Sequence, residues 1–248
     1  MRHRIFFAVA FVAVALSGVD AHAESGFPGG RRWAIGFGAV ASPSPFVDHR
    51  TRVWPVPVVV YLGERFRAMG PDLNYSVVST PMLRLDLAAG TRFEGFEPGA
   101  SSGLAGMGER RLAFEMGFHV DARRFSLDYR ADVAGTHGGH QLRLAHTRPI
   151  ELHFGALLPS VSATWKSGDL TNYYYGVRES EATASRQAYQ PSGTVVFSAG
   201  IELVRQLNWN WMLMGSVTHE FLPGAVRNSP IVEDHGQTSL SIVLMRIL

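Results

Sequence analysis

Residues 111–132 read RLAFEMGFHVDARRFSLDYRAD, and this stretch decides the fold. Apolar side chains such as Phe114 and Met116 occupy every second position, and charged or polar side chains stand between them. After a short break the alternation resumes with the opposite parity, from Phe125 to Val133. Successive side chains of a β-strand point to opposite faces, so each half predicts a strand with one apolar and one charged face. Soluble strands cluster at about 5–6 residues, whereas both halves have the roughly 9–11 residues of a tilted membrane-crossing strand.

The first residues have the pattern of a secretory signal peptide. Met1 to Arg4 is basic, Ile5 to Leu16 is apolar, and Ala21-His22-Ala23 is a small-x-small cleavage site. The apolar run is too short for a membrane-spanning helix. We therefore expect a cleaved signal peptide at residues 1–23 and one mature domain at residues 24–248.

Composition narrows the fold class of the exported chain. The sequence has no cysteine, so the protein must be stable without disulfides. No stretch of about 18 apolar residues follows Ala23, and 26 glycines and 13 prolines interrupt the chain too often for long helices. The net charge of +2 gives no electrostatic basis for binding nucleic acid. A periplasmic β-sandwich and an outer-membrane β-barrel remain.

The lengths of the breaks between strands favour the barrel. About twelve alternating segments are expected, with ten as the alternative. The long breaks follow the first, fifth, ninth and eleventh segments, so all of them lie on one side of the sheet. Outer-membrane barrels have short periplasmic turns and long outer loops, whereas a sandwich has no reason to sort its loops in this way. We predict an all-β, transmembrane antiparallel barrel in lipid of the bacterial outer membrane, with strands at residues 32–42, 53–62, 64–69, 73–80, 82–89, 111–121, 123–133, 139–146, 150–165, 194–207, 209–221 and 237–248.

The alternation also assigns the two faces of the barrel. A charge that faces lipid at mid-depth costs roughly 2–4 kcal/mol, so the charged side chains are expected inside. Aromatic residues near strand ends, such as Trp33 and Trp209, predict belts at the membrane interfaces. At the C-terminus we favour the register with Arg246 inside and Met245 toward lipid over the opposite one. The residues expected to line the lumen are Arg111, Glu115, His119, Arg124, Asp128, Arg130 and Asp132.

Several short motifs of the mature chain stand out: Asn172-Tyr173-Tyr174-Tyr175-Gly176-Val177, Glu181-Ala182, Tyr189-Gln190-Pro191, Ser229-Pro230-Ile231-Val232, Ser42-Pro43 and Val56-Pro57. Together these motifs resemble those of the MipA/OmpV family of outer-membrane proteins. The resemblance implies a barrel and a non-enzymatic scaffold that joins a lytic transglycosylase to a bifunctional peptidoglycan synthase. Other members are linked to adhesion or to passage of small molecules, so a surface-contact protein and a channel for small solutes stay open as alternatives. The chain departs from the family in ending on Leu248 where an aromatic residue is usual.

Two motifs that suggest chemistry have simpler explanations. Residues 99–103 match G-x-S-x-G, but a nucleophile elbow needs an α/β sheet that this chain lacks. His137 and His140 are spaced to share a metal ion, but no carboxylate or thiolate accompanies them at a fixed offset. We expect polar loop residues there, and no catalytic residue, metal or cofactor.

The tyrosines of the longest loop have two possible roles. Exposed tyrosines make good recognition surfaces, and Tyr173, Tyr174 and Tyr175 are candidates for such contacts together with Ser229 and Pro230. Alternatively, the three rings pack over the mouth of the barrel as a plug. The sequence does not choose between these roles.

Overall fold

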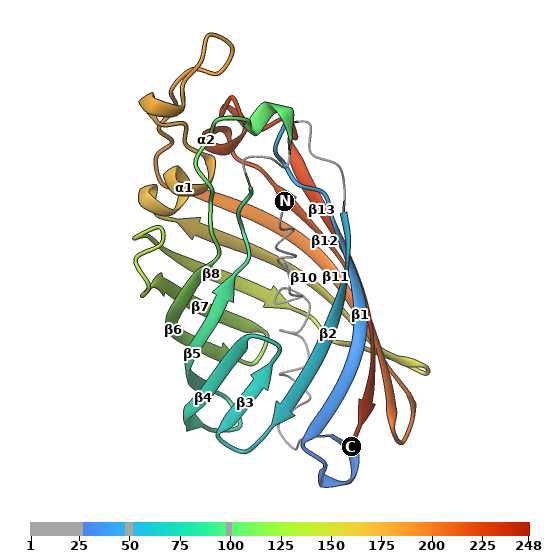
Figure 1. The fold of residues 1–248 in the computed structure, drawn as a ribbon. Coiled ribbons are helices and arrows are strands. Elements are labelled where there is room, and N and C mark those ends of the chain that lie inside the picture. Colours follow the sequence, from blue (N-terminus) through green and yellow to red (C-terminus); the bar gives the residue numbers. More distant parts are fainter. Residues whose placement is uncertain (1–26, 48–51, 98–100) are drawn as a thin grey trace.

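The computed structural model describes residues 27–47, 52–97 and 101–248. The predicted signal peptide and the first part of the G-x-S-x-G motif lie outside these residues. The described chain is built mainly from antiparallel strands, with both α-helices at one end (Figure 1). The helical segments are η3 (Pro28–Gly30), η4 (Ser102–Leu104), α1 (Gly168–Tyr175), η5 (Glu179–Glu181) and α2 (Gly224–Arg227). The strands are β1 (Trp33–Ser42), β2 (Arg52–Leu62), β3 (Phe66–Met69), β4 (Asp72–Ser79), β5 (Arg84–Arg92), β6 (Ala113–Ala122), β7 (Phe125–Asp132), β8 (His140–Thr147), β9 (Ile150–Leu152), β10 (Gly155–Lys166), β11 (Thr194–Asn208), β12 (Trp211–Phe221) and β13 (Gly236–Ile247).

The strands form one closed sheet. Neighbours in sequence pair antiparallel, and β13 pairs with β1 to complete the ring. β8 and β9 both pair with β10 and share one place, so the 13 strands make a barrel with twelve places. Apart from the short β9, which pairs with β10 alone, closure gives each strand a partner on both sides. A membrane requires such pairing because its interior offers no water to backbone groups. The predicted all-β barrel and its strand number are confirmed.

The four long loops lie at one end of the barrel, as the sequence predicts. They follow β1, β5, β10 and β12, and they carry both α-helices (Figure 1). Among the described residues no helix is long and apolar enough to cross a membrane. One predicted turn is wrong, because the chain bends at Arg148-Pro149 and continues as β9. The reversal comes later, at His153-Phe154.

Exposure alternates along the strands and identifies the two faces. Glu115 is 5% exposed, whereas its neighbours Phe114 and Met116 are 42% and 50% exposed. In a closed sheet the exposed apolar set faces outward, toward the acyl chains of a membrane. The favoured C-terminal register is wrong, since Met245 is buried inside and Arg246 is exposed on the outer face.

The inner face has two unlike walls. The inner apolar wall lies on β1, β2, β12 and β13, and its side chains pack together in one cluster. The inner charged wall lies on β3 to β7 and is described below. The buried residues of the inner apolar wall are Phe27, Ala34, Val40, Val56, Val58, Val60, Leu62, Met214, Val243, Met245 and Ile247.

Candidate functional site

The most buried contact of the inner charged wall is an ion pair that reaches across β4, from β3 to β5. Arg67 on β3 binds Asp86 on β5, and both side chains are buried. Ser76 on β4 donates from Oγ to Asp86 Oδ1 at 2.6 Å. Two charges placed in a low-dielectric interior must be paired and hydrogen-bonded, because the loss of hydration otherwise outweighs their attraction. The three residues satisfy this requirement.

A second group of charges follows on β6 and β7. His119 lies with Nε2 at 3.0 Å from Asp121 Oδ2 and Nδ1 at 3.5 Å from Asp128 Oδ2. Arg130 donates from Nε to both oxygens of Asp128 at 3.2 Å. Its Nη1 lies 3.8 Å from Asp72 on β4, so this guanidinium reaches across the intervening strands. A side chain at Gly90 would collide with Asp72 and Arg130, which explains the glycine at this position.

A third group joins the wall to the outer loops. Arg92 donates from Nε to Glu115 Oε1 at 2.9 Å and from Nη1 to Glu94 Oε2 at 2.7 Å. Glu94 also accepts from Lys166 Nζ at 2.8 Å and from the Tyr175 hydroxyl at 2.5 Å. Burial raises the pKa of Glu94, but the Lys166 ammonium and the Arg92 guanidinium outweigh it and hold the pKa well below its usual range. Glu94 therefore stays ionised and ties β5 to the loop after β10.

Five of the seven predicted lumen residues lie on the inner face, and two do not. Glu115, His119, Asp128 and Arg130 belong to the contacts above. Asp132 accepts from the backbone N–H groups of residues 134, 137 and 138, and so shapes the β7–β8 loop. Arg111 precedes β6 with 74% of its side chain exposed, and Arg124 is exposed in the β6–β7 turn. Both positions were expected in strands, but β6 begins at Ala113 and β7 at Phe125.

The two candidate metal-binding histidines lie on opposite faces of the barrel wall. His137 Nδ1 accepts from the Gly139 N–H at 3.0 Å, so its Nε2 donates to Glu115 Oε1 at 3.2 Å on the inner side. His140 packs edge-on against Trp165, an exposed residue of the outer face. Among the described residues no three His, Asp or Glu side chains are grouped to hold a metal ion. The two imidazoles therefore do not face a common position.

The long loops meet in one apolar cluster, here called the outer cap. Its residues come from the loops after β1, β5, β10 and β12. These strands are distributed around the ring, and β5 stands opposite β12, so a single cluster of their loops must cross the mouth of the barrel. The buried residues of the outer cap are Phe46, Phe96, Leu104, Met107, Leu170, Tyr174, Tyr175, Val177, Leu222, Val226, Ile231 and Val232.

A buried ion pair fixes the loops of the outer cap to one another. Glu181 accepts from Arg110 Nη2 at 2.8 Å, and it also accepts from the backbone N–H groups of Gly108 and Arg178. Burial raises the pKa of Glu181, but the Arg110 hydrogen bonds and the two backbone donors outweigh it and hold the pKa at about 2. Arg186 in the loop after β10 donates to the carbonyl oxygens of Gly103 and Ala105 in the loop after β5. Polar contacts therefore hold the β5 loop against the β10 loop.

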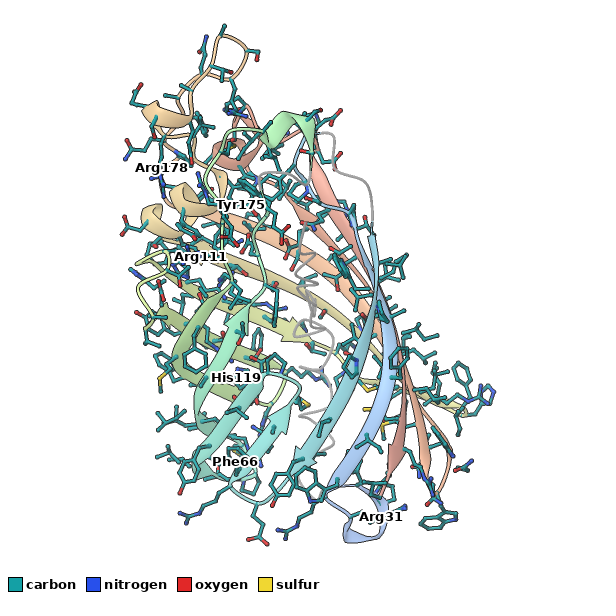
Figure 2. All side chains as sticks on the ribbon, viewed as in Figure 1. Arg31, Phe66, Arg111, His119, Tyr175 and Arg178 are labelled. Atoms are coloured by element: carbon teal, nitrogen blue, oxygen red, sulfur yellow. The ribbon has the colours of Figure 1, made fainter. Side chains whose placement is uncertain are left out.

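The three tyrosines belong to the outer cap. Ser167 begins α1 by accepting from the Leu170 N–H, and the helix turns Tyr174 and Tyr175 inward, where both are buried. Ser229 donates from Oγ to the Tyr175 carbonyl at 2.6 Å, and Pro230 is half-buried beside it. Burial, followed by the Glu94 carboxylate, raises the pKa of Tyr175 well above its usual value. Figure 2 places Tyr175 inside the loop end, and the buried rings of Tyr174 and Tyr175 have the plug arrangement, whereas Tyr173 is half-buried.

The family assignment comes from the sequence along almost the whole barrel. Residues 35–247 match the family described as MltA-interacting protein MipA. The chain belongs to the MipA family. Outer membrane protein OmpV of Vibrio cholerae serotype O1 is 26% identical over 214 residues, which cover 83% of this chain and 82% of OmpV. The MltA-interacting protein of Escherichia coli strain K12 is 24% identical over 247 residues, with 90% of each chain covered.

The fold and the named relatives together place this MipA-family protein in the outer membrane as a β-barrel of the MipA/OmpV type. Its relatives are named as outer membrane proteins and as an interacting protein, and not as enzymes. Among solved structures, the NanC porin covers 88% of this chain and 100% of its own at 9% identity, with a TM-score of 0.41. A likeness at this level carries no statement about function.

Several residues of the site in this MipA-family barrel escape prediction from the sequence. Arg67 and Asp86 stand in short strands whose alternation is weak, and Arg110 and Glu181 stand in loops far apart in the chain. For the Arg110–Glu181 pair the only sequence signal is the Glu181-Ala182 motif. Nothing near this motif in the sequence indicates a buried ion pair. Lys166 is recognisable in the sequence, because it is the only lysine among the 23 Lys and Arg residues.

Proposed function

We propose that this MipA-family barrel is a non-enzymatic scaffold that holds peptidoglycan-remodelling enzymes at the periplasmic end of the barrel. The first partner is a lytic transglycosylase, and the second is a bifunctional peptidoglycan synthase. The name of the relative that covers 90% of the chain, MltA-interacting protein, supports a protein partner of this class. A cleaved signal peptide at residues 1–23 would deliver the chain to this compartment.

The outer cap is the observation that favours a scaffold over an open pore. Twelve buried residues from four loops form one cluster over the mouth, and the Arg110–Glu181 pair links two of those loops. An open pore would need mobile or separated loops, since buried apolar side chains exclude water. A barrel with a covered outer end is better suited to present a fixed surface on its other side.

The periplasmic end offers such a surface. Arg31 donates from Nη1 to Asn210 Oδ1 at 2.7 Å and also binds the Trp209 carbonyl, so the segment before β1 is held against the β11–β12 turn. Beside this contact is an open hollow of about 450 Å³, lined by Pro28, Gln206, Asn208 and Trp209. The Trp209 side chain is 73% exposed. An exposed indole beside a hollow is a common anchor in protein interfaces.

Retention of a purified transglycosylase tests the scaffold proposal. The detergent-solubilised barrel is immobilised, and a lytic transglycosylase is passed over it. We expect the wild-type barrel to retain the enzyme and Trp209→Ala to weaken retention at least tenfold, as for an interface anchor of about 1.4 kcal/mol or more. Trp165→Ala, which removes an exposed indole near the outer loops, is the matched control and should change nothing. Absence of retention by the wild-type barrel, where a known partner pair binds, contradicts the proposal.

A channel for small solutes is the second candidate, and the inner charged wall favours it. Ionised side chains follow one another from Arg67 to Lys166 along a single side of the interior. Such a wall would bind hydrated ions or polar solutes if the outer cap opened. Conductance across a planar bilayer separates this candidate from the scaffold.

A further inference from the structure

The two ends of the barrel carry opposite charge. At the end with the short turns the exposed charged residues are Arg32, Arg65, Arg123, Arg124, Arg148, Arg205 and Arg246 against Glu64 and Glu151. At the outer end the described exposed residues are Arg111, Arg178 and Arg227 against Glu97, Glu109, Asp169, Glu179, Glu233 and Asp234. Figure 2 shows the two ends, with Arg31 and Phe66 at one and Arg178 and Arg111 at the other. The seven exposed arginines of the first end are here called the arginine rim.

Most arginines of the arginine rim have no carboxylate to bind among the residues that the structure describes. Arg32 pairs with Glu64 at 2.8 Å, and Arg205 lies 5.9 Å from the centre of the Phe154 ring. In the part of the chain that the structure describes, Arg65, Arg124, Arg148 and Arg246 have no carboxylate oxygen within 4.0 Å. Their guanidinium groups are therefore available to an anion outside the chain.

The arginine rim is a ring and not a patch. Its residues come from the segment before β1, the β2–β3 and β6–β7 turns, the bend before β9, and the ends of β11 and β13. Exposed aromatic side chains accompany them around the same end, among them Trp33, Phe66, Phe125 and Phe154. Aromatic rings of this kind lie at the headgroup level of a membrane. A protein partner would need a continuous area on one side, whereas lipid headgroups surround the whole circumference.

We infer that the arginine rim binds the phosphate groups of anionic phospholipids in the periplasmic leaflet of the outer membrane. A guanidinium donates two parallel hydrogen bonds to a phosphate, and basic residues near a membrane surface favour anionic lipids. Apart from Lys166, every cationic residue of the chain is an arginine, the side chain best suited to such bidentate contacts. The inference goes beyond the scaffold proposal and does not depend on it.

The test compares boundary lipid in two bilayers. The wild-type barrel is reconstituted into phosphatidylcholine vesicles with and without phosphatidylglycerol, and spin-labelled lipids report which headgroup lies against the protein. We expect phosphatidylglycerol to be enriched about fivefold over phosphatidylcholine, and the enrichment to fall as salt is added. The variant Arg65→Gln/Arg123→Gln/Arg124→Gln/Arg148→Gln should lose most of it. The outer variant Arg111→Gln/Arg178→Gln/Arg227→Gln should keep it.

Each other outcome overturns the inference. Equal partition of the two lipids around the wild-type barrel, or enrichment that salt leaves unchanged, removes the electrostatic basis. The comparison of the two lipids uses the wild-type protein alone, so it stays valid even if the fourfold variant fails to fold. Enrichment that persists in a folded fourfold variant assigns the lipid contact to other residues. If that variant instead loses retention of the transglycosylase and wild-type lipid is not enriched, the rim is a protein-docking surface.

Discussion

The two inner walls of the barrel are stabilised by different interactions. On β1, β2, β12 and β13 the inward side chains are apolar and pack on one another, with Phe27 from the segment before β1 added to the cluster. On β3 to β7 the inward side chains are charged. The Arg92–Glu115 ion pair joins the neighbouring strands β5 and β6, and the Arg67–Asp86 pair reaches across β4 from β3 to β5. The first wall depends on close packing and the second on complete pairing of its charges. The interior of one barrel therefore combines a wall of packed apolar side chains with a wall of paired charges.

The comparison also explains why one wall is easily recognised in the sequence. In β6 and β7 polar and apolar residues alternate, so both faces can be assigned. In β2 the inward Val56 and Val58 and the outward Val59 are all apolar, so the sequence has no alternation to detect. Alternation identifies the faces of a strand only when their surroundings differ in polarity.

The largest expected effect is on the inner charged wall. Asp86→Ala removes the carboxylate that binds Arg67 and leaves a buried positive charge, so we expect a loss of about 3–5 kcal/mol in the free energy of unfolding. Urea unfolding from detergent micelles measures the change. The double variant Arg67→Met/Asp86→Leu removes both charges and should recover most of the loss. A single variant as stable as the wild type contradicts the importance of this pair.

A smaller effect is expected on the inner apolar wall. Met245→Ala removes a buried side chain from the packed cluster, and large-to-small changes of this type cost about 2–4 kcal/mol. Leu244→Ala is the matched control, because its side chain is on the outer face and leaves no internal cavity. The same urea experiment compares the two variants. Equal losses would mean that the inside of this wall is not closely packed.

The smallest of these effects concerns the outer cap and its dependence on pH. The pKa of Glu181 falls from a usual 4.5 to about 2 in the folded protein, so its contribution is complete above pH 4.5 and is lost as the pH falls toward 2. Glu181→Gln should cost about 1–3 kcal/mol in local opening at neutral pH and progressively less in acid. Hydrogen exchange of residues 176–186 measures this opening.

The neighbour Glu179 provides the control for the cap experiment. Its side chain is exposed, so Glu179→Gln should leave exchange unchanged at every pH. If the difference between wild type and Glu181→Gln stays constant from neutral pH to about pH 3, the carboxylate does not hold the loops in the way described.

The sequence predicts the barrel well because the membrane imposes simple rules on strands. Length, alternation and the sorting of long loops to one side each follow from a closed sheet with lipid outside. They predict twelve places in the ring and the inward direction of Glu115, Asp128 and Arg130. The same rules fail at strand ends, where Arg111 and Arg124 continue the alternation but stand outside β6 and β7.

The outer cap is less predictable, because its contacts join loops far apart in the chain. Glu181 binds Arg110, and Ser229 binds the Tyr175 carbonyl, over separations of 71 and 54 residues. Nothing local in either loop specifies such a pairing. The tyrosine motif drew attention to the correct loop, but whether its rings face water or one another depends on the three other loops.

Conductance across a planar lipid bilayer tests most directly whether the outer cap covers the mouth of the barrel. The wild-type protein, folded and inserted, is expected to leave the bilayer silent at neutral pH, whereas a variant that lacks residues 176–190 should show discrete conductance steps. Protease protection verifies insertion, so that silence of the wild type is not mistaken for failure to insert. Steady conductance steps from the wild-type barrel would contradict the covered mouth and would favour the channel over the scaffold.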